Sequence, residues 1–149
     1  MTNEEYKEIL DSICAAIQEQ DTICGRLRPK PIRWDAERME LVAEFQTDEQ
    51  MANPVGGLHG GIIAMIFDNA LGTLTTSFTE GAFAPTAAMN VEYLRPIPAV
   101  GKLYVSGRIM KLGRSLIHLH GELLSTPESN KPLAVATAIF CRTDRKIGV

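Results

Sequence analysis

The hydrophobic pattern of the chain is helical at its beginning. Apolar residues recur at helical spacing in the first 24 residues, at Tyr6, Ile9, Leu10, Ile13 and Ile17. Thr2 followed by Glu5 is the pattern of a capping box, which predicts where this helix begins. We expect the helix to occupy residues 1–24, to end near Gly25, and to pack on the surface of the domain.

Two further elements are predicted before residue 80. Past the breaks at Pro29 and Pro31, alternating apolar residues predict a half-buried strand, at Met39, Leu41, Ala43 and Phe45. A loop rich in Gly and Pro then leads to a helix, expected from about Gly60 to Thr76. This helix is apolar on nearly every side, so most of its surface must be buried.

The rest of the chain has the pattern of β-structure. Four apolar runs follow one another with short turns between them, at residues 87–93, 103–109, 117–123 and 133–141. Consecutive strands with short turns favour an antiparallel sheet, and the apolar helix needs a sheet to cover it. The predicted fold is therefore α+β, with one antiparallel sheet wrapped around a long central helix and an extra N-terminal helix.

Length and charge exclude several classes of function. A chain of 149 residues predicts a single domain over residues 1–149. A net charge of −3 gives no electrostatic reason to expect a nucleic acid as partner. The first residues are acidic, unlike a signal peptide, and the apolar run after Gly61 is too interrupted to span a membrane. The expected location is the cytoplasm, with no membrane partner.

The cysteines and two of the histidines do not make a convincing metal or redox site. Cys14, Cys24 and Cys141 are too scattered for a disulfide framework, and none belongs to a C-x-x-C pair. His118 and His120 share one face of a predicted strand and could ligate an ion together. A third ligand at credible spacing is missing, so we favour a polar strand face and expect no metal.

Asp68 is the unusual residue of the central helix. It carries the only formal charge between Glu49 and Glu80. Its side chain could reach the surface or pair with a nearby hydroxyl or amide. Its apolar neighbours Phe67 and Leu71 favour another interpretation, because a carboxylate in surroundings of low dielectric suits a general base or nucleophile.

The sequence before the helix supplies complementary chemistry. The first backbone N–H groups of a helix lack intrahelical acceptors, so those of Gly60 and Gly61 suit a developing oxyanion. The glycines could also simply allow a tight entry into the helix. Asp68 lies seven positions after Gly61, or roughly 10 Å along a helix. One substrate could therefore use both groups only if they came from two chains, which predicts a site at a dimer interface.

At this point the sequence resembles the hotdog-fold acyl-CoA thioesterases, in their phenylacetyl-CoA thioesterase-like branch. The similarity rests on Asn53, His59-Gly60-Gly61, Asp68 and the stretch "TAAMNVEYLRP" at residues 86–96. It continues through "GKLYVSGRIMKLGRS" to "AVATAIFCRT" and covers roughly residues 46–143. The resemblance implies a hotdog fold, obligate dimers often paired into tetramers, and hydrolysis of an acyl-CoA thioester without a metal or redox cofactor.

The resemblance also implies a role for each residue of the motif. Asp68 corresponds to the catalytic carboxylate, and Gly60 to the residue whose backbone N–H binds the oxyanion. His59 and Asn53 correspond to residues that orient the thioester and the water. Thr86 falls where similar enzymes carry a Ser or Thr that helps to place the nucleophilic water.

The CoA carrier requires its own binding groups. Basic residues near predicted strand ends and turns could pair with its phosphates, and we select Arg95, Lys111 and Arg114, with Lys102 as a weaker candidate. Gly113 would let the backbone of the "KLGRS" turn come close to the ligand. Each of these charges could equally be a solvated residue of a turn. The acyl group and the way in which two dimers pair stay open.

Three other functions are weighed against hydrolysis. A non-catalytic acyl-CoA-binding or regulatory domain would gain nothing from an unpaired carboxylate beside a thioester. A hydratase or dehydratase would need a histidine and a carboxylate arranged for proton transfer at carbon. A purely structural protein leaves the Asn-His-Gly-Asp pattern unexplained.

Overall fold

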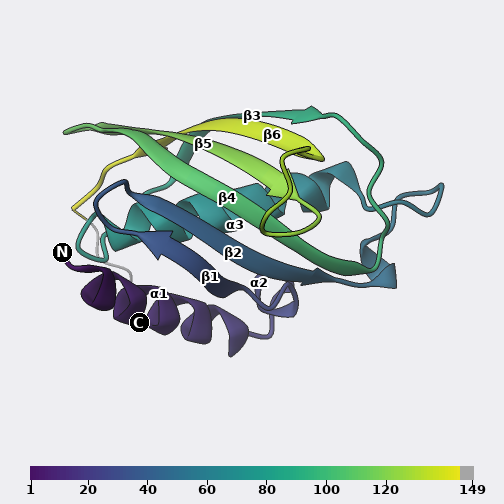
Figure 1. Cartoon of the computed structure of the whole chain (residues 1–149), viewed down its shortest axis with the longest axis horizontal. Coiled ribbons are helices and arrows are strands. Elements are labelled where there is room, and N and C mark those ends of the chain that lie inside the picture. The colour runs from purple at the N-terminus through teal and green to yellow at the C-terminus, as the bar shows by residue number, and fades with distance from the viewer. Residues whose placement is uncertain (145–149) are drawn as a thin grey trace.

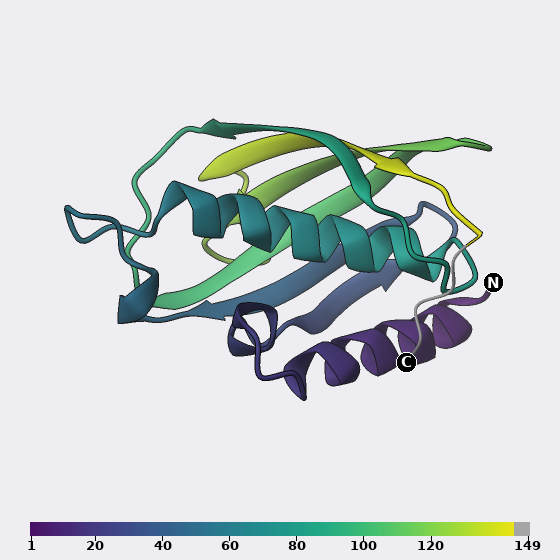
Figure 2. The same ribbon diagram turned by 180° about the vertical axis from the view of Figure 1, so that it is seen from behind.

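The chain folds into an antiparallel sheet that curves around a long helix, as Figures 1 and 2 show. This computed structural model describes residues 1–144. Its elements, in chain order, are α1 (Asn3–Gln18), α2 (Ile23–Arg26), β1 (Lys30–Asp35), β2 (Glu40–Thr47), the single 3-10 turn η1 (Glu49–Met51), α3 (Gly60–Ser77), β3 (Thr86–Tyr93), β4 (Gly101–Leu112), β5 (Leu116–Leu124) and β6 (Ala134–Cys141).

The six strands described here form one sheet in the order β1-β2-β4-β5-β6-β3, and every neighbouring pair is antiparallel. Among residues 1–144, strand β3 pairs with β6 alone, so its other edge has no partner strand in this part of the chain. Figure 2 shows α3 lying across the concave face of the sheet. The prediction of an antiparallel sheet around a central helix is confirmed.

Helix α3 presses one apolar face against this sheet. The buried side chains on that face are Ile63, Ile66, Phe67, Ala70, Leu71 and Leu74. Gly107 of β4 pairs with Gly121 of β5 on the part of the sheet that contacts α3. A Cβ atom on Gly107 would lie 3.0 Å from Cδ2 of Leu71, and one on Gly121 would lie 3.2 Å from Cδ1 of Phe67. The two glycines thus allow the helix to lie closer to the sheet than larger residues would.

Helix α1 begins with the predicted capping box. The Thr2 N–H donates to Oε2 of Glu5 at 2.7 Å, and the Glu5 N–H donates to Oγ1 of Thr2 at 3.1 Å. Hydrogen bonding of the Glu5 carboxyl to the Thr2 backbone N–H, and secondarily to the Thr2 side chain, lowers the pKa of that carboxyl. Tyr6 and Leu10 are fully buried, with the Tyr6 ring edge-on to Phe78 at a centroid distance of 5.0 Å. The helix is therefore anchored in the core as well as lying on the surface.

The predicted end of the first helix is wrong. Helix α1 ends at Gln18 instead of continuing over residues 1–24, and a separate short helix, α2, follows it. Thr22 caps α2, its hydroxyl accepting a hydrogen bond from the Gly25 N–H. A Cβ atom on Gly25 would lie only 2.1 Å from the Gln20 carbonyl oxygen. Gly25 therefore allows the chain to reverse tightly between the two helices. It lies inside α2 and does not mark the end of α1.

Strand β1 is an addition to the predicted elements. It contains Pro31, which we treated as a break, but β1 is an edge strand and its pairing with β2 shifts register between Pro31 and Arg33. Proline is tolerated at such positions because an edge strand leaves one row of N–H groups unpaired. Met39 belongs to the turn before β2, with φ of 53°, and not to the strand itself. Among residues 1–144, no helix is both long and apolar enough to cross a membrane.

Candidate functional site

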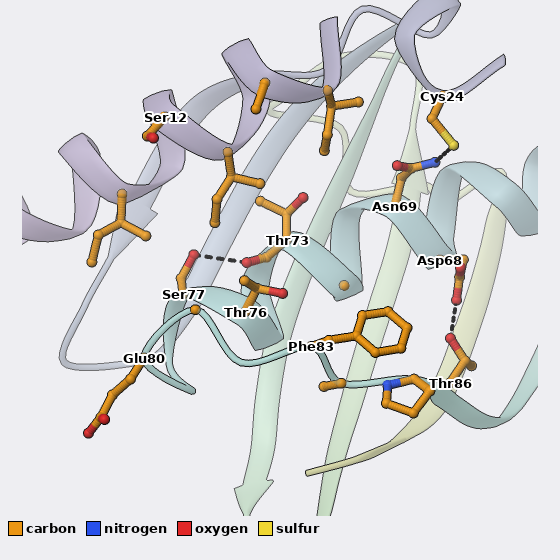
Figure 3. Close-up of a pocket in the computed structure, with 18 of the residues that line it drawn as sticks. Ser12, Cys24, Asp68, Asn69, Thr73, Thr76, Ser77, Glu80, Phe83 and Thr86 are labelled. Atoms are coloured by element: carbon orange, nitrogen blue, oxygen red, sulfur yellow. Dashed lines mark hydrogen bonds between the residues drawn. The ribbon is translucent and has the colours of Figure 1, made fainter. Parts of the chain in front are cut away.

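Both ends of strand β3 are tied to helix α3 by a side-chain hydrogen bond. At its first residue, the Thr86 hydroxyl donates to Oδ1 of Asp68 (Figure 3). At its last residue, the Tyr93 hydroxyl donates to the carbonyl oxygen of Gly60 at 2.8 Å. The helix and the edge strand therefore hold two separate polar groups of residues, one near each end of β3.

A β-bulge turns Thr86 toward Asp68. In β3 the side chains of Met89 and Val91 pack toward the core, so strict alternation would place Thr86 on the outer face. The register with β6 shifts between Thr86 and Ala88, and Thr86 pairs with Phe140, which is buried. A bulge reverses the direction of the side chains on one side of it. Thr86 thereby points to the same side of the sheet as α3.

Asp68 is half-buried and not deep in the core. The helix is apolar all round in sequence, yet within one chain its outward face is open at Gly61 and only partly covered at Met65 and Asp68. Thr86 is the only hydrogen-bond partner of the Asp68 carboxylate among residues 1–144. This contact matches the interpretation that we did not favour, in which Asp68 pairs with a nearby hydroxyl. The second carboxylate oxygen remains available to accept a hydrogen bond from water.

The start of α3 leaves one backbone N–H available. His59 is the N-cap of α3, and its Nδ1 accepts a hydrogen bond from the Gly61 N–H at 2.9 Å. The Gly61 amide is therefore engaged inside the chain. The Gly60 N–H makes no hydrogen bond to any of residues 1–144, while its carbonyl is held by Tyr93. A free N–H at the positive end of an 18-residue helix is well placed to bind a developing negative charge.

Asn53 organises the loop that leads to this helix end. Its Oδ1 accepts hydrogen bonds from the N–H groups of Val55 and Gly57, both at 3.0 Å. Its own N–H donates to the Gly57 carbonyl at 2.7 Å, and the His59 N–H donates to Met51 at 2.9 Å. With Oδ1 so occupied, the Nδ2 amino group of Asn53 is the part of its side chain that could meet a ligand.

The chain does not bring all five predicted catalytic residues together. Asn53, His59 and Gly60 belong to the loop and first turn of α3, whereas Asp68 and Thr86 form a pair farther along the helix. Gly60 and Asp68 are eight residues apart in one helix, or about 12 Å. An aspartate side chain cannot cover that distance within its own chain.

The predicted phosphate-binding residues also fall into two groups. Arg95 follows the end of β3, where its Nε donates to the Pro132 carbonyl at 3.3 Å. Lys111, Gly113 and Arg114 lie at the β4–β5 hairpin. A Cβ atom on Gly113 would lie 2.3 Å from the Leu116 carbonyl oxygen, so the glycine is required by the turn itself. By strand register, the hairpin lies at the Thr86 end of β3 and Arg95 at the Tyr93 end.

An elongated groove lies between α1, α3 and the loop before β3, and the sequence did not reveal it. It has a volume of about 1150 Å³, and both Asp68 and Thr86 line it (Figure 3). Phe83 is an aromatic residue of the groove lining. Phe78 packs on Tyr6, Met89 packs against the core, and Tyr93 contacts Gly60. The apolar residues of α1 did not indicate a groove, because packing of the helix on the domain accounted for all of them.

The two histidines on β5 do not belong to a larger cluster. His120 Nε2 lies 3.9 Å from Oε1 of Glu122, and His118 lies across from Lys111 in the sheet. Within the described part of the chain, no three His, Cys, Asp or Glu side chains are grouped so that they could hold a metal ion.

Comparison with known proteins identifies the family. The family model described as "Thioesterase superfamily" matches residues 55–129, just over half of the chain. The chain belongs to the thioesterase superfamily. Its matched segment contains His59, Gly60, Asp68 and Thr86, so the unengaged amide and the Asp68–Thr86 pair both lie inside the superfamily domain.

Individual members of the superfamily show similar sequences and folds. Mouse acyl-coenzyme A thioesterase 13 is 32% identical over 78 residues, which are 52% of this chain and 55% of that protein. Rat acyl-coenzyme A thioesterase THEM4 is 31% identical over 104 residues, which are 70% of this chain and 44% of that protein. The chain thus spans about half the length of the curated relatives it matches.

A solved structure covers more of the chain. The crystal structure of a phenylacetic acid degradation-related protein from Ralstonia eutropha JMP134 is 25% identical, with a TM-score of 0.75. The match covers 89% of this chain and 98% of that one. The predicted hotdog fold and the resemblance to the phenylacetyl-CoA thioesterase-like branch are confirmed.

Proposed function

We propose that this protein is an acyl-CoA thioesterase, which hydrolyses a thioester to a free acid and CoA. The observation that carries the proposal is the attachment of both polar groups to opposite ends of β3. The Asp68–Thr86 pair offers a carboxylate with one open oxygen, and the Gly60–Tyr93 pair offers an unengaged N–H at a helix start. General-base and oxyanion-binding groups are the two elements that thioester hydrolysis needs.

The open edge of β3 provides the means to combine these groups. Antiparallel pairing of two copies of Thr86–Tyr93 around its midpoint, between Met89 and Asn90, would set Thr86 of one subunit opposite Tyr93 of the other. Asp68, bound to Thr86, would then approach Gly60 of the partner subunit, which is bound to Tyr93. A twofold dimer would contain two such composite sites. In each site Asp68 and Gly60 would come from different subunits, so their separation of about 12 Å within one helix would not prevent them from acting together.

The proposed reaction begins with attack of water on the thioester carbonyl. The Gly60 N–H binds the carbonyl oxygen as it becomes an oxyanion, and Asp68 removes a proton from the attacking water. The carbon–sulfur bond then breaks, the CoA thiolate leaves and is protonated, and the acid is released. One backbone donor contributes on the order of 3 kcal/mol, and a general base accelerates such a step by about 10² to 10⁴. Direct nucleophilic attack by Asp68 is the variant of the same proposal.

The same pairing would gather the basic residues. Arg95 lies at the Gly60 end of β3, whereas Lys111 and Arg114 lie at the Thr86 end. Each composite site would therefore contain Arg95 from one subunit and both Lys111 and Arg114 from its partner. We expect these cations to bind the phosphates of CoA. Association of dimers into tetramers and a cytoplasmic location stay predictions.

The decisive experiment measures release of free thiol from a panel of acyl-CoAs by the wild-type protein, Asp68→Asn and Asp68→Ala. We expect hydrolysis by the wild type and a loss of at least about 10²-fold in kcat for Asp68→Asn. Equal rates for wild type and Asp68→Asn would show that the Asp68 carboxylate has no catalytic role. Binding of acyl-CoA by all three proteins without thiol release would establish the alternative, a non-catalytic acyl-CoA-binding domain.

A further inference from the structure

We propose that the groove between α1 and α3 holds the acyl chain of the substrate, and that α1 determines how long that chain can be. This inference rests on the proposed thioesterase function and adds the substrate class to it: neutral acyl groups with an extended apolar part. It also gives a role to the N-terminal helix, in which the sequence shows no chemistry.

The groove includes the proposed catalytic pair and extends along α3. Asp68 and Thr86 line one part, and Gly72, Thr73 and Thr76 of α3 continue the same wall. Asp68 and Thr76 are eight residues apart on α3, which corresponds to about 12 Å. In the view of Figure 3, Thr73 and Thr76 lie between Ser12 of α1 and Phe83 of the loop before β3. A thioester held at Asp68 would therefore have an elongated space beside it for its acyl chain.

Helix α1 carries apolar side chains in addition to those that pack in the core. Tyr6, Leu10 and Cys14 are its buried residues and fix it to the body of the domain. A second apolar strip, formed by Ile9, Ile13, Ala16 and Ile17, lines the groove instead. Ile9 is 36% exposed, and Phe83, which also lines the groove, is 46% exposed. Apolar side chains that face each other across an open space form a site for an apolar ligand.

The charges of the groove determine which end of the substrate enters it. Its charged side chains are all acidic, namely Glu5, Glu8, Asp68 and Glu80, and among residues 1–144 no Lys or Arg lines it. The phosphates of CoA would be repelled there. The candidate cations Lys111 and Arg114 lie instead at the β4–β5 hairpin, outside the lining. The carrier must therefore extend away from the groove, and only the acyl part can occupy it.

The chain offers a matched pair of substitutions on α1. Ala16 lines the groove and is half-buried, whereas its neighbour Ala15 is exposed and does not line it. Ala16→Phe would fill part of the groove, and Ala15→Phe would place the same ring in solvent. Neither residue belongs to the Asp68–Thr86 pair or to the start of α3, so both variants keep the proposed catalytic groups. Ser12→Phe, at another groove position on α1, serves as a second filling variant.

The test is the dependence of kcat/KM on acyl length, from acetyl-CoA through a series of straight-chain acyl-CoAs. For the wild type we expect kcat/KM to rise by up to roughly fourfold per methylene buried, until the groove is full. Ala16→Phe should reach its plateau at a shorter chain than the wild type. Ala15→Phe should follow the wild-type curve throughout. A plateau at the same length in Ala16→Phe and Ser12→Phe as in the wild type would overturn the proposal.

Cys24 gives a readout that does not need catalysis. It lines the groove, and the Nδ2 of Asn69 donates to its Sγ at 3.5 Å. With Asp68→Asn protein, a long-chain acyl-CoA should slow alkylation of Cys24, mapped by mass spectrometry, whereas CoA alone should not. Equal protection by CoA and by acyl-CoA would place the carrier in the groove and contradict the inference. Protection without hydrolysis by the wild type would disprove the proposed function but support the groove as an acyl site.

Discussion

Thr86 donates a hydrogen bond to the Asp68 carboxylate across 18 positions of sequence. The contact depends on the bulge at the start of β3, which turns the Thr86 side chain toward the helix. The other oxygen of Asp68 has no hydrogen-bond partner among residues 1–144, and Asp68 lines the groove. In the proposed mechanism the hydroxyl therefore orients the carboxylate and takes part in placing the water.

Replacement of Thr86 tests this orientation. Thr86→Val keeps the shape of the side chain but removes the hydroxyl, and we expect kcat to fall by about 10- to 100-fold, because a hydrogen bond to a charged group contributes about 1.5–3 kcal/mol. KM should change little. Thr86→Ser keeps the donor and should retain most of the activity. Equal activity of the Val and Ser variants would show that the hydroxyl has no catalytic part.

Gly60 allows the backbone N–H itself to be removed. His59 has φ −65° and ψ 133°, a conformation suited to a residue before proline, and Gly60 occupies the first helical position, where proline is accepted. Gly60→Pro should therefore fold and lose about 10²- to 10³-fold in kcat, as expected for an oxyanion donor. Gly60→Ala keeps the N–H, and its Cβ would lie 3.4 Å from the Tyr93 ring, an ordinary contact. It should stay active.

The same substitution tests the shared site. If Asp68 of one subunit works with Gly60 of the other, a mixture of Asp68→Ala and Gly60→Pro subunits will contain hybrid dimers with one intact site. We expect activity in the mixture that neither variant shows alone, up to half the wild-type rate per hybrid dimer. Subunit exchange, followed by mass spectrometry, is the control. Exchange without recovery of activity would place both groups in one subunit.

Tyr93 holds the carbonyl of Gly60 although its side chain is 53% exposed. Tyr93→Phe removes this hydrogen bond but keeps the ring against the helix start. A neutral hydrogen bond contributes about 1 kcal/mol, so we expect kcat to fall by roughly three- to tenfold. Tyr104→Phe, on β4, is the matched control and should leave kcat unchanged. An equal fall in kcat in both variants would show that the Tyr93 hydroxyl does not position Gly60.

The sequence predicted the elements whose packing is local and left out those determined by distant partners. The helix Gly60–Ser77 was readable because every turn of it carries apolar residues, and strands β3 to β6 because they alternate. The bulge at Ala87 could not be predicted from the sequence, because it depends on the register between β3 and β6. Neither could the groove, because Ala16 and Thr76 are ordinary helix residues until α1 is placed against α3.

Gly107 makes the contact between sheet and helix testable. A larger side chain there would press on Leu71, with Cβ already 3.0 Å from Cδ2 of that residue. We expect Gly107→Val to lower the free energy of unfolding by about 1–3 kcal/mol, the usual cost of overpacking. Gly72→Ala is the control, since its Cβ would meet Phe140 at an ordinary 3.7 Å and alanine favours the helix. Urea unfolding of both variants measures the difference, and equal stability would contradict close packing at Gly107.

Cys14 should make the stability of the protein depend on alkaline pH. Burial raises the pKa of its thiol from 9.0 to about 11, so the thiol ionises in the unfolded chain before it does in the folded one. Below pH 9 both states are protonated and the thiol adds no pH dependence. Between pH 9 and 11 its ionisation favours unfolding, and at pH 10 this removes about 1.4 kcal/mol of stability.

Urea unfolding of the wild type and Cys14→Ala at pH 8 and pH 10 measures this contribution. Cys14→Ala will be less stable at both pH values because it leaves a smaller side chain in the core. Its loss of stability from pH 8 to pH 10 should nevertheless be smaller than that of the wild type, by about the amount attributed to the thiol. Cys24→Ala keeps Cys14 and should reproduce the wild-type dependence. Equal losses in the wild type and Cys14→Ala would mean that the Cys14 thiol ionises alike in the folded and unfolded chains.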